Sequence, residues 1–372
     1  FFTDSGRFTV QNGTLQVAAE SLGGDAVSIF HVGDALPGYF EVQASVSATK
    51  PTAGWKANSY IIFDYQGKDD FKFAGLDVSL SKLVMGHRDA TGGHVDEQTP
   101  VKGGAKADTY NNMLLSVNGL NATLVVDNKF VFTHTYQPRV VEGYSYGLNW
   151  GLIGVGSDNS RGSFDNFRVQ VLPPQLTFQS TENFSDGAAD LFTGQSIGVW
   201  GVSSGRYTAT PTAGAALSIL DLGPDHLNHT SMLDMNVKLN TQARAGVVFD
   251  RYGDESFKFA AIDAATDKAM IGHYTKKGGW AIDATSSKVI DAGTDYTLGV
   301  VLKGTTVSVT LNGQVLLGYS FNAATVDGNF GLMAVGGAAS FDDVKIKTND
   351  PAFIESASSN MVAETVLGSD TG

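Results

Sequence analysis

The 372-residue chain contains no cysteine, which excludes disulfides, thiolate zinc sites and cysteine nucleophiles. It also lacks any apolar run approaching the roughly 18 residues of a membrane span, so we expect a chain that does not span a membrane. Charged residues are scarce, at 17%, and the formal net charge is −13. An acidic balance of this kind argues against nucleic acid or an anionic membrane as a partner.

Glycine and apolar residues are abundant, with 44 glycines and 42% apolar residues. This composition suits an all-β chain with many turns. The stretch 39–48 alternates apolar and polar residues with the period of a strand that has one wet face, and Asn12-Gly13 is a strong hairpin signal. Around 310–315 the alternation slips by one position, which predicts either an odd loop residue or a bulge after the turn.

The chain repeats itself over a long distance, because residues 61–94 return as 247–280 at a constant offset. The shared positions include Phe71-Lys72-Phe73, Gly86-His87 and Gly92-Gly93. A period this long indicates a whole domain present twice. We therefore expect one domain over 1–174, a second over 175–350 and a linker or tail over 351–372, with the boundary at Pro173-Pro174. The opening residues are not Met, and the second repeat has upstream residues that the first lacks, so we expect further domains of a larger parent chain.

These repeated phenylalanine, glycine and aspartate positions, together with SFDNFRV at 163–169 and SFDDVKI at 340–346, resemble the concanavalin A-like jelly roll. Within that superfamily they are most similar to laminin-G-like modules of large bacterial secreted or surface proteins of the adhesin type. The resemblance implies two homologous antiparallel β-sandwiches in tandem, and a secreted, extracellular or cell-surface location. Such proteins include lectins, glycan-binding modules, glycosidases, polysaccharide lyases, adhesion modules and spacers.

An enzyme of this superfamily would need catalytic side chains that converge. A glycosidase uses two carboxylates that flank a groove, but Asp96-Glu97 and Asp254-Glu255 are adjacent and would point to opposite faces of a strand. A lyase would pair a histidine with a cation, as His87 could with Arg88, whereas Tyr274 follows His273. Since that basic partner is not constant, we interpret both histidines as turn residues and assign no catalytic residue.

Calcium is the cofactor that we expect, because acidic loops readily supply the oxygen ligands that this ion prefers. First and last strands of a jelly roll adjoin, so the predicted ligands in the second domain are Asp186, Asp190 and Asp342, and Asp165 is the counterpart of Asp342 in the first. The alternative is that these acidic residues are solvated turn formers.

Carbohydrate recognition would use exposed aromatic side chains beside hydrogen-bonding groups. In the second domain we expect Trp280 and Tyr274 to form a stacking surface, with Asp263 or Asp283 bound to sugar hydroxyls. His94 stands at the place of Trp280 in the first domain. The predicted ligand-binding residues are Trp280, Tyr274, Asp263, Asp283, His94, His87 and Trp55.

The sequence thus predicts a non-enzymatic extracellular module that binds a glycan or another cell-surface ligand, with calcium supporting the fold. Two alternatives stay open: a structural spacer in a large surface protein, and a polysaccharide-degrading enzyme or its accessory module. Phe71, Phe73, Phe257 and Phe259 recur with the period of a strand and are predicted to be core residues.

Overall fold

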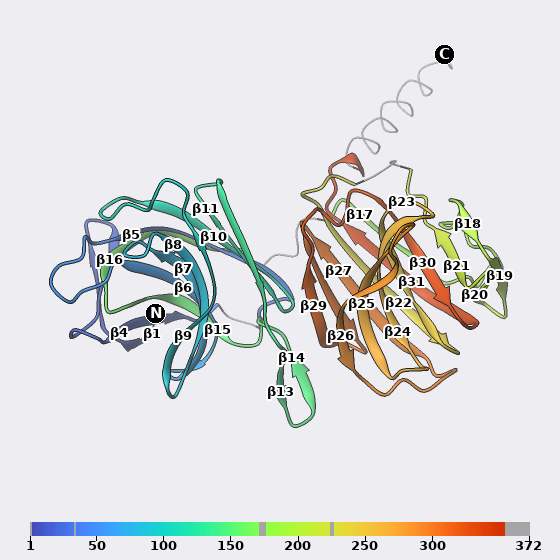
Figure 1. Ribbon diagram of the computed structural model, residues 1–372, viewed down its shortest axis with the longest axis horizontal. Coiled ribbons are helices and arrows are strands. Elements are labelled where there is room, and N and C mark those ends of the chain that lie inside the picture. Colours follow the sequence, from blue (N-terminus) through green and yellow to red (C-terminus); the bar gives the residue numbers. More distant parts are fainter. Residues whose placement is uncertain (1, 33–34, 171–175, 224–226, 354–372) are drawn as a thin grey trace, which may run out of the picture. The chain divides into compact units, whose positions relative to one another are not determined.

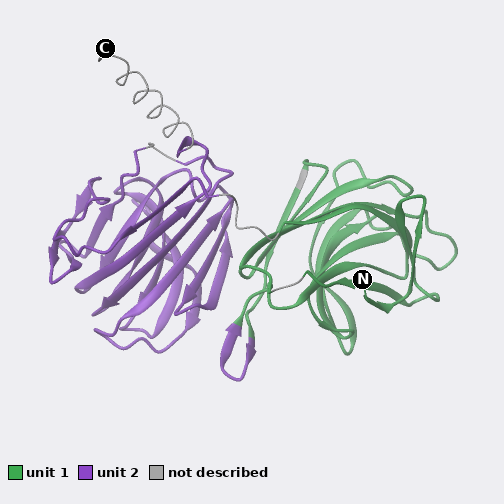
Figure 2. Cartoon of the chain, turned by 180° about the vertical axis from the view of Figure 1, so that it is seen from behind, with its two compact units in different colours: residues 1–139, 146–173 green, residues 140–145, 174–372 purple. Residues whose placement is uncertain are grey.

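A computed structural model describes residues 2–32, 35–170, 176–223 and 227–353. They form two compact units, one from the described residues within 1–139 and 146–173 (unit 1) and one from those within 140–145 and 174–372 (unit 2), coloured separately in Figure 2. The boundary predicted at Pro173-Pro174 and most of the predicted tail lie outside the described residues. Among the described residues, only Ala352 and Phe353 are helical. Over this part of the chain, no helix is long and apolar enough to cross a membrane.

Unit 1 contains two seven-stranded antiparallel sheets (Figure 1). In sheet 1 the spatial order is β1 (Phe2–Ser5), β4 (Asp25–Phe30), β15 (Leu152–Asp158), β6 (Asn58–Gly67), β7 (Asp70–Asp77), β8 (Lys82–Asp89) and β9 (Gly92–Pro100). In sheet 2 it is β12 (Phe130–Thr135), β11 (Asn121–Val126), β10 (Asn111–Asn118), β5 (Tyr39–Ala48), β16 (Arg161–Gln170), β3 (Thr14–Ala18) and β2 (Arg7–Gln11). A separate two-stranded hairpin pairs β13 (Arg139–Val141) with β14 (Tyr144–Tyr146), and its residues 140–145 are grouped with unit 2.

Unit 2 repeats this arrangement. Sheet 3 has the order β18 (Ser196–Ile197), β21 (Ala215–Ile219), β30 (Asn329–Val335), β23 (Arg244–Gly253), β24 (Ser256–Asp263), β25 (Lys268–Thr275) and β26 (Gly279–Ser287). Sheet 4 has the order β19 (Val199–Ser203), β20 (Arg206–Thr210), β31 (Ala339–Thr348), β22 (Met232–Thr241), β27 (Tyr296–Lys303), β28 (Thr306–Leu311) and β29 (Gln314–Ser320), and β17 (Phe178–Glu182) also pairs with β31. The predicted pair of concanavalin A-like antiparallel sandwiches is therefore confirmed, with equivalent strand orders in the two units.

Each sandwich is held together by apolar side chains between its two sheets. In unit 1 the alternating residues Phe40, Val42 and Ala44 of β5 are fully buried against Ile61 and Phe63 of β6. Burial of the larger of these side chains, Phe, Val and Ile, contributes about 1.5–3 kcal/mol each. The alternation that predicted a strand over 39–48 thus also identified its buried face.

The slip in alternation near 310–315 is a β-bulge. Val309 pairs with Leu317, but the next residue, Thr310, pairs with Val315, so Leu316 is the extra residue on β29. The bulge lets both Leu311 and Leu316 be buried. One of the two predicted explanations of the slip is therefore confirmed.

The repeated SFD motifs form a second kind of bulge, in the last strand of each unit. The register of β16 shifts between Asp165 and Arg168, and that of β31 against β22 shifts at the same place in the repeat. The carboxylates of Asp165 and Asp342 accept hydrogen bonds from the next backbone N–H at 2.7 and 2.8 Å. These following residues, Asn166 and Asp343, have φ values of 52° and 47°, which short polar side chains tolerate well.

Candidate functional site

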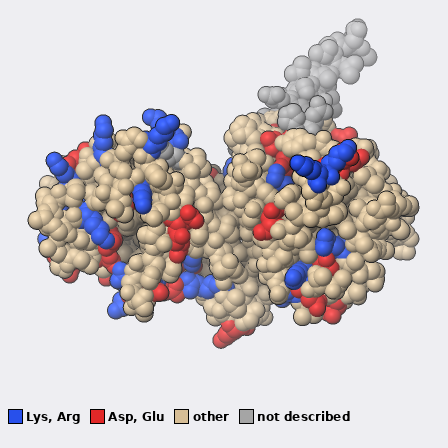
Figure 3. Space-filling model, viewed as in Figure 1, with Lys and Arg blue, Asp and Glu red and all other residues tan. Residues whose placement is uncertain are grey.

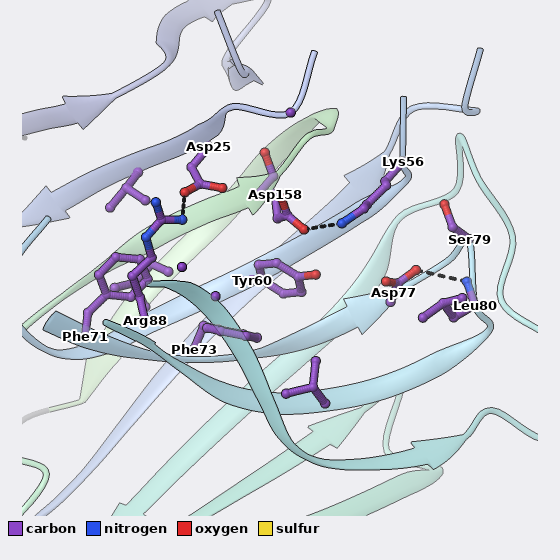
Figure 4. Close-up of a pocket in the computed structure, with 17 residues that line it drawn as sticks. Asp25, Lys56, Tyr60, Phe71, Phe73, Asp77, Ser79, Leu80, Arg88 and Asp158 are labelled. Atoms are coloured by element: carbon purple, nitrogen blue, oxygen red, sulfur yellow. Dashed lines mark hydrogen bonds and ion pairs between the residues drawn. The ribbon is translucent and has the colours of Figure 1, made fainter. Parts of the chain in front are cut away.

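Sheet 1 carries a groove on the face that points away from sheet 2. The groove has a volume of about 550 Å³ and is lined from six strands and the loops that join them. Figure 4 shows its side chains, with Arg88 near one end, Asp77 near the other and Tyr60 between them. Its lining residues are Gly23, Asp25, Val27, Lys56, Tyr60, Ile62, Phe71, Phe73, Asp77, Ser79, Leu80, Arg88, Gly92, Gly93, Val95, Ser157 and Asp158.

The floor of the groove is an apolar layer distinct from the core between the sheets. Tyr60, Phe71 and Phe73 are at most 8% exposed and pack together with Ile62 and Val84. Because residues alternate between the two faces of a strand, their neighbours Ile61 and Ala74 face sheet 2 instead. The prediction that Phe71 and Phe73 are core residues is correct for their burial. They nevertheless line the groove and do not pack between the sheets.

A glycine makes room for this floor. Gly86 on β8 pairs with Phe73 on β7, and a Cβ atom at Gly86 would lie 2.5 Å from the Phe73 ring and 2.0 Å from the carbonyl oxygen of His94. Gly272 stands in the same relation to Phe259 in unit 2. The repeated Gly-His dipeptide is therefore explained in part by packing at the glycine.

Two ion pairs border the groove. Arg88 of β8 forms a short contact with Asp25 of β4. Lys56 lies 2.6 Å from the carboxylate of Asp158 at the end of β15 (Figure 4). The Lys56 and Asp158 side chains are about half exposed, whereas those of Arg88 and Asp25 are more buried. Donors and acceptors of both signs thus surround an apolar floor.

A further carboxylate, Asp77, closes one end of the groove. It accepts a hydrogen bond from the Leu80 backbone N–H at 2.9 Å (Figure 4). Asp77 is 6% exposed and forms no salt bridge among the described residues. Desolvation raises the pKa of Asp77 above 3.8, although the Leu80 and Ser79 N–H groups and the charge of Lys56 act in the opposite direction.

In unit 2 two aromatic side chains fill the part of this face above Phe257 and Phe259, and Tyr274 also lines a separate cavity of about 570 Å³ beside His273 and Asp283. Trp280 lies edge-on to Phe257 and Phe259, with ring centroids 5.6 and 5.2 Å apart, and Tyr274 stacks on Phe257 at 5.2 Å. The predicted stacking pair is thus half-buried and packs on the phenylalanines that correspond to the unit 1 floor. By strand register and repeat offset, the unit 1 groove residues Asp25, Lys56, Arg88 and Asp158 correspond to Ala215, Gln242, Tyr274 and Val335.

The register corrects the predicted match between His94 and Trp280. In unit 1 Asp89 pairs with Gly92, whereas in unit 2 Thr275 pairs with Gly279, so the second turn is one residue longer. His94 therefore pairs with His87. In unit 2 Ala281 takes the corresponding position opposite His273, and Trp280 pairs with Tyr274.

The repeated histidines have a partner that the sequence prediction missed. His87 Nδ1 lies 2.7 Å from Asp96, and His273 Nδ1 lies 2.7 Å from Asp283. Both aspartates are the extra residues of equivalent bulges in β9 and β26. Our interpretation of both histidines as turn residues is therefore replaced by a carboxylate contact across the strands. The sequence contained a signal for this contact, because Asp96 follows His87 and Asp283 follows His273 at a similar distance along the chain.

His87 and Arg88 do not form the pair that a lyase would need. Arg88 lines the groove. His87 pairs with Lys72, whose side chain contacts Asp64 and the ring of Tyr136 away from the groove floor. Adjacent residues of a strand point to opposite faces, so these two side chains act on different surfaces.

The remaining predicted ligand-binding residues are occupied by protein groups. Asp263 is 4% exposed, is ion-paired with Arg244 at 3.0 Å and accepts a hydrogen bond from the Ala265 N–H. Trp55 lies in a loop with the guanidinium of Arg161 4.8 Å from its ring centroid. Neither residue lines the groove of unit 1.

Three of the four predicted calcium ligands, Asp165, Asp186 and Asp342, have carboxylates in contact with protein groups. Asp342 lies 3.2 Å from Lys238 and 3.8 Å from Arg206. Asp186 accepts the Ala188 N–H, and the backbone N–H of Asp190 donates to Glu182. Among the described residues, these carboxylates are not part of a group of three acidic or histidine side chains with ligand atoms within 4.8 Å. Their present arrangement does not fit a calcium ion, so a calcium site there would need these loops to rearrange.

Basic side chains are scattered over the face that Figure 3 shows, with uncharged surface between them.

Neither a protein-family model nor a curated protein matches the chain. Among solved structures, the chain is similar to the carbohydrate-binding module CBM66 from Bacillus subtilis, with 16% identity, a TM-score of 0.34, and coverage of 46% of this chain and 96% of that one.

Two other similar structures are a laminin domain pair and an alginate lyase. Domains LG4-5 of the mouse laminin α1 chain align with 12% identity and a TM-score of 0.27 over 93% of this chain and 91% of that one. An alginate lyase from Pseudomonas aeruginosa aligns with 14% identity and a TM-score of 0.29 over 40% of this chain and 84% of that one. Because these TM-scores are below 0.5, the fold assignment rests on the strand order and register of this chain, and the site is argued from its own residues.

Proposed function

We propose that the groove of unit 1 binds a carbohydrate chain and that the protein acts as an extracellular or cell-surface binding module without catalysis. The observation that supports this proposal is the contrast between two equivalent faces. In unit 1 two ion pairs and Asp77 surround an open apolar floor. In unit 2 the part of the equivalent face above Phe257 and Phe259 is filled by Tyr274 and Trp280.

The chemistry of the groove matches a sugar ring, which has apolar C–H faces and a rim of hydroxyl groups. Ligand pockets of about 300–1,000 Å³ combine an apolar lining with a few placed polar groups, and this groove has both. Carboxylates of Asp25 and Asp158 would accept hydrogen bonds from hydroxyls, while Arg88 and Lys56 would donate. Because each cation is paired with a carboxylate, the groove favours neutral sugars over strongly anionic ones.

Binding without turnover is favoured over lyase activity by the separation of His87 from Arg88 on opposite faces of β8. For unit 2 the filled face favours a spacer role, in which it sets the distance between unit 1 and further domains of a parent chain. The two functions are compatible, because one unit would bind and the other would hold it in place.

A glycan-array screen with the full chain tests this proposal. The decisive variant is Asp25→Ala with Arg88→Tyr, which installs the residues of unit 2 and leaves neither charge unpaired. We expect wild-type binding to at least one neutral glycan, and a loss of tenfold or more in the variant, equivalent to about 1.4 kcal/mol. Arg168→Ala, an exposed change on sheet 2, is the matched control and should bind as wild type does.

Three outcomes would contradict the proposal: a blank array, unchanged affinity in the double variant, or an equal loss in the Arg168→Ala control. A blank array would favour a spacer role for the whole chain. Release of shortened or unsaturated oligosaccharides from any bound glycan would instead favour an enzyme.

A further inference from the structure

The end of the β8–β9 hairpin in unit 1 gathers three side chains with metal-binding chemistry. Ligand atoms of His87, Asp89 and His94 all lie within 4.8 Å of one another. The strand geometry explains this, because His87 and Asp89 are two residues apart on one face of β8 and His94 is the cross-strand partner of His87. The two imidazole rings stack with centroids 5.0 Å apart.

These side chains are accessible to an ion from solvent. The side chains of His87, Asp89 and His94 are 40, 49 and 45% exposed. Asp89 is held toward the cluster, since its Oδ1 accepts hydrogen bonds from the Thr91 N–H and hydroxyl at 2.7 and 2.6 Å and lies 3.1 Å from His94 Nε2. Ligand atoms around a tetrahedral ion are roughly 3.3 Å apart, given bond lengths of about 2 Å, so small rotations of exposed side chains bring the three together.

A fourth residue supplies the outer contact that metal-binding histidines usually have, meaning a hydrogen bond to the ring nitrogen that does not bind the ion. The carboxylate of Asp96 lies 2.7 and 2.9 Å from His87 Nδ1. A carboxylate that accepts the Nδ1 proton leaves the Nε2 lone pair available for an ion and fixes the ring orientation. Asp96 occupies this place because it is the extra residue of the β9 bulge.

Unit 2 retains the outer contact but lacks two of the three ligands. His273 Nδ1 contacts Asp283 at 2.7 Å. Thr275 occupies the position of Asp89, and Ala281 pairs with His273 where His94 pairs with His87. The histidine–aspartate pair is therefore common to both units, whereas the complete donor set is specific to unit 1 among the described residues.

We propose that His87, Asp89 and His94 form a binding site for a zinc-like divalent transition-metal ion, oriented by Asp96. Two imidazole nitrogens and one carboxylate oxygen suit Zn²⁺ and its neighbours in the first row, with water in the fourth position. Calcium prefers six to eight oxygen ligands and does not match this donor set. The site is distinct from the groove, because Arg88, which lies between two of the ligands, points to the other face of β8.

Titration of the full chain, without any histidine tag, with Zn²⁺ tests the site by calorimetry. We expect one equivalent per chain in wild type and its loss in His94→Ala, which copies the alanine of unit 2. Asp96→Asn should weaken binding about tenfold or more, as outer-contact changes do. His273→Ala, the matched change in unit 2, should leave the equivalent intact. Ca²⁺ in large excess should not displace Zn²⁺.

A gain-of-site variant makes the assignment sharper. Thr275→Asp with Ala281→His completes the same donor set around His273, and we expect a second equivalent of Zn²⁺. Thermal unfolding without metal confirms that each variant is folded. The proposal is overturned if wild type takes up no Zn²⁺, if His94→Ala retains the equivalent, if His273→Ala loses it, or if the gain-of-site variant binds no more than wild type.

Discussion

Asp77 and Asp263 occupy equivalent positions at the ends of β7 and β24, but only Asp263 has an arginine partner. Asp263 is the cross-strand partner of Arg244 and also forms an ion pair with it. The cross-strand partner of Asp77 is Asn58, which carries no charge. Burial without an ion pair raises the pKa of Asp77. One carboxylate is thus compensated inside unit 2, and the other lines the groove of unit 1 without an ion pair.

Asp77→Asn should therefore stabilise the chain at neutral pH. A folded-state pKa above the unfolded value means that Asp77 favours folding most below its unfolded pKa and loses that contribution as pH rises through the folded pKa. The amide keeps an oxygen for the Leu80 N–H. We expect the variant to melt at a higher temperature than wild type at pH 7 and the gap to close toward pH 4. A gap that widens in acid would contradict this.

The matched change in unit 2 should act in the opposite direction. Asp263→Asn leaves Arg244 without its charge partner, and losing one member of a buried pair costs about 3–5 kcal/mol. We expect the lower end of that range because the Arg244 side chain remains 22% exposed. Chemical denaturation at pH 7 measures the loss.

Trp280→Ala tests whether the filled face of unit 2 serves packing. Trp280 contacts Phe257, Phe259 and Tyr274. Removing a fully buried tryptophan costs about 3–5 kcal/mol, and we expect about 2 kcal/mol for this half-buried one. Glycan affinity of the full chain should be unchanged. A variant as stable as wild type that has lost glycan binding would instead restore the sequence-based assignment of the ligand site to Trp280.

Chelation tests the calcium prediction at Asp186, Asp190 and Asp342. An ion present at 100 times its dissociation constant would add about 2.7 kcal/mol to the folded state. Since Lys238 and Arg206 already compensate Asp342, we expect the melting curve to be the same in EGTA and in millimolar Ca²⁺. A drop of several degrees in EGTA, abolished by Asp342→Asn, would establish the calcium site.

Much of the fold could be predicted from the sequence, but the groove could not. Repeated positions indicated a duplicated domain, the resemblance to the concanavalin A-like jelly roll implied two sandwiches, and the slip near Leu316 predicted an odd loop residue or a bulge. The groove was hidden because β6 to β8 are apolar on both faces. In such strands periodicity cannot separate the residues that face the other sheet, such as Ile61, from those that line a pocket, such as Ile62 and Phe73.

The metal-binding cluster was hidden by one residue of register. The matching Gly92-Gly93 and Gly278-Gly279 pairs suggested turns of equal length. On that basis His94 and Trp280 were treated as equivalent positions of the two repeats. The turn of unit 2 is longer by one residue and the bulges at Asp96 and Asp283 shift the pairing again. Cross-strand partners depend on such single-residue shifts, so the contact between His87 and His94 needed three-dimensional information.

The two units also share a buried ion pair at a left-handed residue, which provides the last prediction. Asp64 and Asp250 have φ values of 46° and 48° and side chains at most 4% exposed, and they form short contacts with Lys72 and Lys258. Asp64 is also bonded by Gln66 and Arg139 at 3.2 Å. In Asp250, by contrast, Oδ1 has no hydrogen-bond partner among the described residues, and burial lowers the pKa of Lys258.

We expect Asp250→Asn to destabilise unit 2 by about 3 kcal/mol, because it removes the carboxylate in direct contact with the Lys258 ammonium and leaves only the charges of Asp327 and Asp283 to favour that ammonium. Asparagine tolerates the left-handed conformation, so the loss reports the charge and not the backbone. Adding Lys258→Met removes the orphaned charge and should recover most of the loss, since an apolar replacement of a buried pair is often neutral. Urea unfolding of the two single variants and the double variant gives the coupling free energy. A double variant no more stable than Asp250→Asn alone would show that the ion pair does not govern stability at this site. The stability would then come from the packing of Lys258 on Phe321, whose ring centroid lies 5.0 Å from the ammonium nitrogen.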